Sequence, residues 1–178
     1  MLGTGWQRPH DERCPQRIVK IARDRHRAQR QARRRPGTTR PHPHLGTVEL
    51  RVPDAQAKPD YAVALATLTQ CLMATADDYA PEDARNVSEN KWRSIRRGAG
   101  ARFHDFSRRE EKGAREVARD LVARLRPVSQ DLGCEAELGG VLEILDRGTG
   151  AEMQRAAYEK RGALEDVVDY LLRTTAPI

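Results

Sequence analysis

The chain has 178 residues, a formal net charge of +6, and a composition of 33% charged and 4% aromatic residues. This length suits one domain, and its core must be aliphatic because aromatic side chains are scarce. No apolar run approaches the roughly 20 residues that span a bilayer, and no secretory signal is recognisable. Three widely spaced cysteines without a CxxC pair argue against a disulfide framework and predict a cytoplasmic protein with reduced thiols.

The first 39 residues are expected to form a basic leader without stable structure. Residues 1–40 hold 12 of the 32 Lys and Arg residues but only three of the 26 acidic residues. Their apolar side chains are too few to offset the entropy cost of ordering. A solvated tail is favoured, and a nucleic-acid-binding arm stays open because Lys and Arg clusters attract phosphate. A leader translated from a shifted reading frame is a third hypothesis, which fits its Arg-, Pro- and Gly-rich composition.

The segment Gly46–Asp54 is predicted to form a strand with two distinct faces. With a side-chain period of 2, the polar face carries Glu49 and Arg51, and the opposite face can pack against helices. A hard divalent cation takes carboxylate oxygens, and a planar guanidinium grips phosphate. The pair therefore suits a site for a metal and a phosphate, although an ordinary surface ion pair has the same pattern. The apolar face consists of Val48, Leu50 and Val52.

Beyond this strand the chain is predicted to be helical, and no second strand is expected, so the strand's partners would lie outside the chain. Apolar residues recur at helical spacing along most of the remaining sequence. Residues 99–112 are expected to be an exposed connection, and the helix that follows them is expected to be bent or broken at Pro127. The predicted helices lie at about residues 59–76, 81–98, 117–125, 138–148, 151–161 and 164–174.

Several single residues have predicted structural roles. Trp92 is expected to be a core anchor, since that is commoner than a base-stacking platform. Thr149 is a candidate N-cap, and Gly162 is a candidate C-cap between the last two helices. Cys71 and Cys134 are interpreted as structural residues, because no histidine is placed in sequence to activate either thiol.

Three ordered segments carry a resemblance to a known family. They are Arg40-Pro41-His42-Pro43-His44-Leu45-Gly46-Thr47-Val48-Glu49-Leu50-Arg51-Val52-Pro53-Asp54-Ala55-Gln56, Ser88-Glu89-Asn90-Lys91-Trp92-Arg93-Ser94-Ile95-Arg96, and Ile144-Leu145-Asp146-Arg147-Gly148-Thr149-Gly150-Ala151. With these motifs, residues 40–178 resemble the C-terminal part of the carboxylate–amine ligases, a branch of the glutamate–cysteine ligases in the glutamine-synthetase-like superfamily. Three motifs in the same order are more specific than any one of them.

The resemblance implies an α+β parent fold, of which this segment is mostly α-helical with one strand or a small incomplete sheet. It implies ATP and Mg²⁺ as cofactors, glutamate or a similar carboxylate and an amine as substrates, and an acyl-phosphate intermediate. Glu49 would be a metal ligand, Arg51 the catalytic phosphate clamp, and Asn90 and Arg93 contacts for the nucleotide. A solvated helix face is the competing interpretation for Asn90 and Arg93.

Three questions about the whole chain stay open at this point. The resemblance predicts an incomplete ligase, whose missing N-terminal half could come from another chain or be replaced by a homo-oligomer. Whether the chain is active alone is doubtful, because the relatives' other carboxylates come from strands outside the matched region. The alternative function is a non-enzymatic helical module whose basic arm binds nucleic acid, a partner that is the less favoured of the two.

Overall fold

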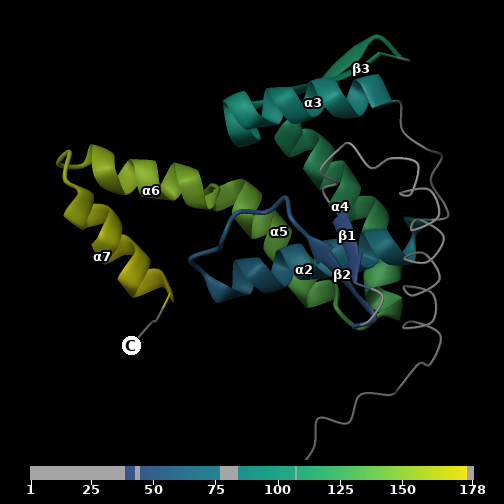
Figure 1. Ribbon diagram of the computed structural model, residues 1–178, viewed down its shortest axis with the longest axis horizontal. Helices are drawn as coiled ribbons and strands as arrows, with labels where there is room; N and C mark the ends of the chain where they lie inside the picture. The colour runs from purple at the N-terminus through teal and green to yellow at the C-terminus, as the bar shows by residue number, and fades with distance from the viewer. Residues whose placement is uncertain (1–38, 43–44, 77–83, 107, 176–178) are drawn as a thin grey trace, which may run out of the picture. The chain divides into compact units, whose positions relative to one another are not determined.

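The computed structural model describes residues 39–42, 45–76, 84–106 and 108–175 (Figure 1). The chain divides into two units, residues 1–53 and 54–178, which are termed the hairpin unit and the helical unit. The predicted leader and the predicted helix start at Pro81 lie outside the described residues. Helices dominate the part that is described, and short antiparallel strands accompany them, as the α+β prediction expected.

The hairpin unit pairs the predicted strand with a second strand of the same chain. Strand β1 (Thr39–His42) runs antiparallel to β2 (Thr47–Leu50), and Arg40 lies opposite Glu49. The turn between them includes Gly46 at φ +62°, a backbone conformation that glycine adopts without steric cost. The expectation that this strand has no partner within the chain is therefore wrong. Pro41 lies within β1, and a strand at a sheet edge tolerates proline.

The predicted apolar face of this strand is only partly realised. The strand β2 ends at Leu50, so that Arg51 and Val52 follow it as irregular chain. Leu50 is 37% exposed and Val52 is 60% exposed, so these two apolar side chains are open to solvent. Val48 alone of the three is partly buried.

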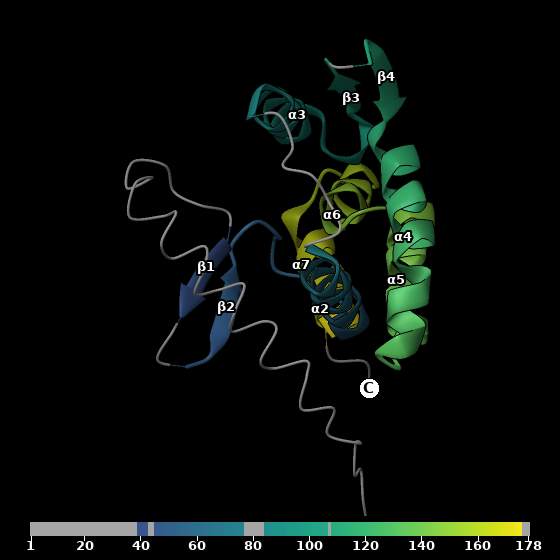
Figure 2. The ribbon, with the colours of Figure 1, turned by 90° about the vertical axis from the view of Figure 1, so that its right-hand side faces the viewer.

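The core of the helical unit lies between three helices that lie side by side in Figures 1 and 2, namely α2 (Pro59–Ala74), α4 (Ala114–Asp131) and α5 (Glu135–Arg147). The predicted apolar stripe on α2 packs against this core without being fully buried itself. Small residues allow close approach of α2, where Ala64 is 1% exposed and Cys71 is 0% exposed. The buried core residues are Ala64, Cys71, Val122, Leu125, Leu138, Val141 and Ile144.

Helix α4 continues through Pro127, which corrects the prediction of a break at that residue. Proline removes one backbone donor from the helix and crowds the preceding turn. Residues on both sides of it are fully buried, Leu125 and Ser129 at 0% exposure. Burial of this face against the other core helices stabilises the helix through Pro127. Tertiary packing thus outweighs the low helix propensity of proline.

The segment between α2 and α4 contains a helix and a second hairpin. Helix α3 (Ala84–Arg97) ends in the 3₁₀ turn η2 (Gly98–Gly100), and Gly98 adopts φ +54° at the predicted stop. Strands β3 (Arg102–Asp105) and β4 (Glu110–Gly113) then form an antiparallel pair. The exposed connection predicted for residues 99–112 therefore contains a strand pair that the prediction did not include. Figure 2 shows this hairpin at the start of α4, into which β4 leads directly.

The last two helices match their predictions closely. Helix α6 (Gly150–Glu159) begins with a capping box in which Thr149 and Glu152 bond to each other's backbone amides. Gly162, at φ +70°, lies between α6 and α7 (Leu164–Thr175), but the C-cap of α6 is Lys160, so the C-cap prediction for Gly162 is wrong by two residues. None of the helices in the described residues has both the length and the apolarity needed to cross a bilayer.

Candidate functional site

The predicted metal and phosphate pair lies in the hairpin unit. The Arg51 Nε atom lies 3.6 Å from Glu49 Oε1, and the two side chains are 55% and 43% exposed respectively. The carboxylate and the guanidinium thus lie side by side, as the strand pattern predicted, although β2 itself ends at Leu50, and both side chains are exposed to solvent. Such a pair can attract a cation through its carboxylate and a phosphate through its guanidinium.

The described residues do not form a magnesium site on their own. Mg²⁺ requires near-ideal octahedral oxygen coordination, commonly from one or two carboxylates, substrate phosphates and water. Glu49 offers one carboxylate, and its Oε1 atom already lies near Arg51. No group of three or more His, Cys, Asp and Glu side chains that could hold a metal occurs within the described ranges. Glu49 can therefore supply one ligand of such a site, and the others would have to come from outside these residues.

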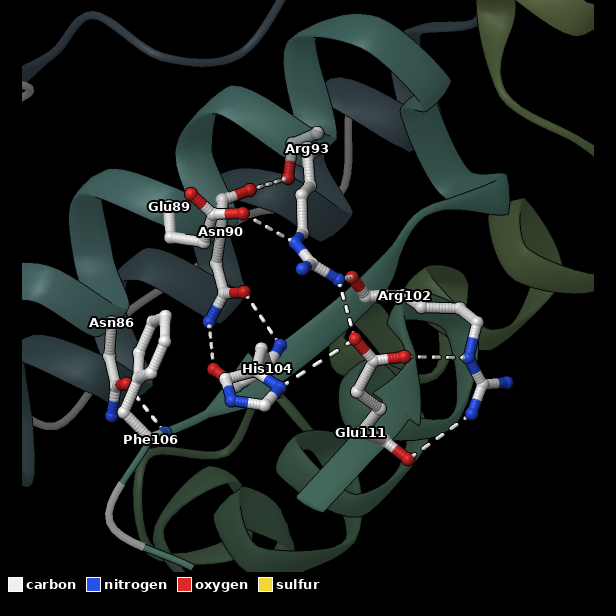
Figure 3. Close-up of polar contacts among 9 residues, drawn as sticks. Asn86, Glu89, Asn90, Arg93, Arg102, His104, Phe106 and Glu111 are labelled. Carbon is white, nitrogen blue, oxygen red and sulfur yellow. Dashed lines mark hydrogen bonds and ion pairs between the residues drawn. The ribbon is translucent and has the colours of Figure 1, made fainter. Parts of the chain in front are cut away.

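The other two predicted site residues, Asn90 and Arg93, lie on α3 and bind the backbone of β3 (Figure 3). The Asn90 Nδ2 atom donates to the His104 carbonyl oxygen at 2.9 Å, and the His104 amide donates to Asn90 Oδ1 at 2.7 Å. One turn earlier on the helix, Asn86 Oδ1 accepts from the Phe106 amide at 2.9 Å. The asparagine side chains therefore bind the strand edge as a neighbouring strand would.

Arg93 extends this set of contacts along the same strand. Its Nη1 atom donates to the Arg102 carbonyl oxygen at 3.2 Å, so α3 contacts the backbone of three alternate residues, 102, 104 and 106. Alternate residues of a strand direct their backbone groups to the same edge. The spacing of 86, 90 and 93 places three polar side chains on one helix face. That face covers a strand edge which would otherwise have unpaired backbone groups.

Charges reinforce the attachment of α3 to the hairpin. Arg93 donates through Nε to Glu89 and through Nη1 to Glu111, at 2.9 and 2.8 Å. Arg102 also donates to Glu111 through Nε, at 3.4 Å. These guanidinium bonds, that of Arg93 foremost, hold the pKa of the Glu111 carboxyl below its usual value. The pKa of Arg93 is raised, first by its bond to Glu89 and then by that to Glu111.

His104 completes the cluster between α3 and the hairpin. Its ring meets Phe106 edge to face, with centroids 4.3 Å apart. The buried Nδ1 atom lies 3.6 Å from Glu111 Oε1, which is beyond hydrogen-bond distance. His104 and Glu111 were not among the predicted site residues. The hairpin that carries them gives little sequence signal, because its turn has Arg109 at φ 56° in place of a glycine.

The four predicted site residues therefore form two separate pairs. Glu49 and Arg51 are neighbours in the hairpin unit, and Asn90 and Arg93 belong to one network in the helical unit. The contacts of the second pair are structural ones that neither predicted interpretation anticipated. Nucleotide contact by Asn90 and Arg93 remains a prediction.

The structure also tests the roles that the sequence predicted for Trp92 and Cys71. Trp92 is 56% exposed, so the prediction of a core anchor is wrong, because α3 directs its polar face inward to the hairpin. Cys71 is fully buried, and its burial, together with the nearby Cys134, raises the pKa of its thiol to about 12. A thiol with that pKa stays protonated at neutral pH and is a poor nucleophile, in agreement with the predicted structural role.

Comparison with known proteins identifies the family. The model of glutamate–cysteine ligase family 2 matches residues 16–170, starting earlier than the predicted boundary at residue 40. The chain is 55% identical over 137 residues to "Putative glutamate--cysteine ligase 2-3" of Rubrobacter xylanophilus. It is 51% identical over 143 residues to the protein named 2-1 of that organism, and 42% identical over 141 residues to a relative in Clavibacter michiganensis.

The matches cover a larger share of this chain than of its relatives. They cover 77%, 78% and 75% of this chain, but 38%, 38% and 37% of the respective relatives. The chain thus spans less than two fifths of the length of the relatives that it matches. Since the family match extends over most of its residues, this chain belongs to glutamate–cysteine ligase family 2.

Proposed function

We propose that this chain contributes part of the active site of an ATP-dependent carboxylate–amine ligase that joins glutamate to cysteine or a similar amine. The observation that carries the proposal is the solvent-open Glu49 and Arg51 pair within the family segment. A carboxylate beside a guanidinium provides for both charges that ATP chemistry brings together, a divalent metal and a phosphate. The names of the relatives support the ligase class.

The proposed reaction has two steps. A substrate carboxylate oxygen attacks the γ-phosphorus of ATP, and ADP leaves with the electrons of the broken phosphorus–oxygen bond. The amine nitrogen then attacks the acyl carbon, phosphate leaves, and the nitrogen gives up a proton to solvent. In both steps Arg51 would bind the transferring phosphate through its guanidinium, which stabilises the charge of the transition state.

Two elements of the proposal extend beyond these two residues. ATP and Mg²⁺ are proposed as cofactors, with Glu49 as one metal ligand and the remaining ligands from outside the described residues. Asn90 and Arg93 are proposed to contact the nucleotide. Their bonds to β3 would then fix the positions of their side chains on the helical unit.

Activity is proposed to require additional polypeptide. The chain matches 38% of the Rubrobacter relative, and a single carboxylate does not complete a magnesium site. The missing part could be supplied by a separate chain that corresponds to the unmatched part of the relative. A second copy of this chain is the alternative source.

The test is ADP release with glutamate, Mg²⁺ and a panel of amines that includes cysteine. The full chain is assayed alone and after co-expression with the unmatched part of the Rubrobacter relative. Glu49→Ala should abolish turnover, and Arg51→Ala should reduce kcat by about 100-fold or more, the usual loss for a group that stabilises transition-state charge. Glu159→Ala is the matched control, because Glu159 is an exposed glutamate at the end of α6, outside the proposed site, and should leave turnover unchanged.

Two results would contradict the proposal. Turnover that survives Glu49→Ala and Arg51→Ala would remove both residues from the reaction. Absence of turnover in every combination, together with nucleic-acid binding that weakens steeply with salt and disappears on deletion of residues 1–40, would favour the non-enzymatic alternative.

A further inference from the structure

Helix α3 has an exposed apolar face opposite the polar face that holds the hairpin. Val87, Trp92 and Ile95 are 52%, 56% and 75% exposed. At 100° per residue they fall within an arc of roughly 140°, which lies away from Asn90 and Arg93. These three residues are termed the outer face of α3.

This arrangement reverses the usual amphipathic pattern of a surface helix, in which the apolar face points to the core. In the described part of the helical unit, α3 packs on β3 through asparagine and arginine side chains, and Asn86 is its one buried residue. Because α3 is attached through its polar face, its large apolar side chains are exposed to solvent. Exposed apolar patches commonly mark binding surfaces for another polypeptide.

Basic side chains border this face. The guanidinium of Arg96 lies 5.3 Å from the centre of the Trp92 ring, which places a cation on the aromatic surface. Lys91 is exposed within the same arc, between Val87 and Ile95. Apolar side chains accompanied by cations are common at protein interfaces. The fitting partner has an apolar patch that is bordered by carboxylates.

The comparisons indicate where such a partner comes from. Helix α3 lies within residues 16–170, the region shared with the family. The 137 residues that align with the Rubrobacter relative correspond to 38% of that longer chain. The relative's helix is therefore embedded in a protein of which the greater part has no counterpart in the match.

We infer that the outer face of α3 is the docking surface for a polypeptide equivalent to the unmatched part of the relatives, through an apolar patch with an acidic border. This inference rests on the proposed function, since it names the partner that would complete the ligase. In the complex, Trp92 and Ile95 become buried, and Arg96 exchanges its contact with water for one with a carboxylate.

The test uses Trp92 as a reporter. The chain has two tryptophans, Trp6 and Trp92, so a Trp6→Phe variant of the full chain leaves Trp92 alone. This variant is co-expressed with a tagged unmatched part of the Rubrobacter relative that has its own tryptophans replaced by phenylalanine. The two polypeptides should copurify, and Trp92 should be shielded from acrylamide and emit at shorter wavelength than in the chain alone.

Matched substitutions locate the interface. Ile95→Asp should reduce the recovered complex at least tenfold, because it places a carboxylate in the centre of the contact. Val63→Asp makes the same kind of change at a residue of α2 that is 49% exposed, and it should leave recovery unchanged. Equal losses in both variants, or a Trp92 that stays open to acrylamide in the complex, would overturn the inference.

A chimera keeps the inference testable if no complex is recovered. In it, residues 40–178 of this chain replace the matched segment of the full-length relative. Ile95→Asp should then lower the Tm of the chimera by several degrees, whereas it should leave the Tm of the present chain unchanged. A chimera that is indifferent to Ile95→Asp would overturn the inference.

Two outcomes separate this inference from the proposed function. A complex that buries Trp92 but does not turn over ATP would refute the proposed function and leave the docking surface standing. ATP turnover that is unaffected by Ile95→Asp would refute the docking surface alone. Dimerisation of the chain by itself that is lost in Ile95→Asp would assign the outer face of α3 to a second copy and overturn the inference.

Discussion

At the scale of single residues, the Asn90 side chain makes the pair of backbone hydrogen bonds that a neighbouring strand would make. Its amide group accepts from and donates to the backbone of His104. Asn90→Ala removes both bonds and leaves a partly buried amide and carbonyl without this partner. We expect the free energy of unfolding to fall by about 1–3 kcal/mol, and the His104 amide to exchange its proton faster.

The measurement is hydrogen exchange of β3, with denaturant unfolding of the same variant. Ser94→Ala is the control on the same helix, since the Ser94 hydroxyl donates only to the Asn90 carbonyl within α3. It should change neither quantity appreciably. Unchanged protection of His104 in Asn90→Ala would mean that β4 alone secures the strand.

Glu152 links three helices and makes stability depend on pH. Its carboxylate accepts from the Thr149 amide at 2.7 Å and from Arg115 Nη2 at 2.8 Å, and Arg115 also donates to the Leu145 carbonyl. These bonds, that from the Thr149 backbone foremost, hold the pKa of Glu152 below 4.5. Because the folded pKa is depressed, the stabilisation is present above about pH 4.5 and is lost as the pH falls through the folded value.

The expected consequence is a pH-dependent effect of Glu152→Gln. With the side chain 35% exposed, solvent screening limits the loss at pH 7 to about 1 kcal/mol. The difference between the two proteins should shrink as the pH falls below 4.5, which urea unfolding at several pH values would measure. Glu159→Gln, at the end of the same helix, should be neutral or slightly stabilising at pH 7. A difference for Glu152→Gln that is constant with pH would contradict the role of its charge.

At the scale of elements, two adjacent glycines of α5 should respond oppositely to alanine. A Cβ atom at Gly140 would lie 2.9 Å from the Cβ atom of Ala64, whereas at Gly139 it would have no neighbour within 4 Å. Gly140→Ala should force α2 and α5 apart and cost about 1–3 kcal/mol of overpacking. Gly139→Ala should stabilise the protein by about 0.5–1 kcal/mol through helix propensity alone. Urea unfolding of both variants measures these changes in stability. A stabilised Gly140→Ala variant would show that the approach of Gly140 to Ala64 does not set the spacing of α2 and α5.

Local sequence patterns predicted the elements that depend on local physics. Apolar spacing indicated the core helices, and Thr149 marked the start of α6, because an N-cap depends on residues close in sequence. The β3–β4 hairpin was missed, since its turn uses Arg109 at positive φ without the usual glycine signal. Helix α4 passes Pro127 because distant residues bury its flanks.

The same distinction applies to the candidate site. The neighbourhood of Glu49 and Arg51 agrees with the two-residue spacing of an extended chain and could be predicted, although Arg51 lies just beyond the end of β2. The attachment of Asn90 and Arg93 to β3 could not, because it joins side chains to backbone groups that are 9 and 14 residues away in sequence. The exposure of Trp92 also follows from this attachment, because it determines which face of α3 points inward.

At the scale of the whole molecule, the core that the described residues form lies in one of the two units. Every buried residue of the core cluster, from Ala64 to Ile144, lies after residue 53. The helices that carry them contact one another across the sequence, with α2 against both α4 and α5. A domain that has its own hydrophobic core can in principle fold alone. Residues 54–178 should therefore fold without the residues that precede them.

A chain that begins at Asp54 should therefore unfold cooperatively, with a Tm close to that of the full chain. For a domain of this size, a contribution of 1 kcal/mol from residues 1–53 would correspond to a shift of about 4 °C. Circular dichroism during heating, with the full chain measured in the same buffer, provides the comparison. Since Arg51 and Glu49 are absent from the shorter chain, it should fold but be unable to support ATP turnover with the complementing polypeptide. A fall in Tm of more than about 4 °C, or a gradual transition, would mean that residues before Asp54 help to stabilise the helical core.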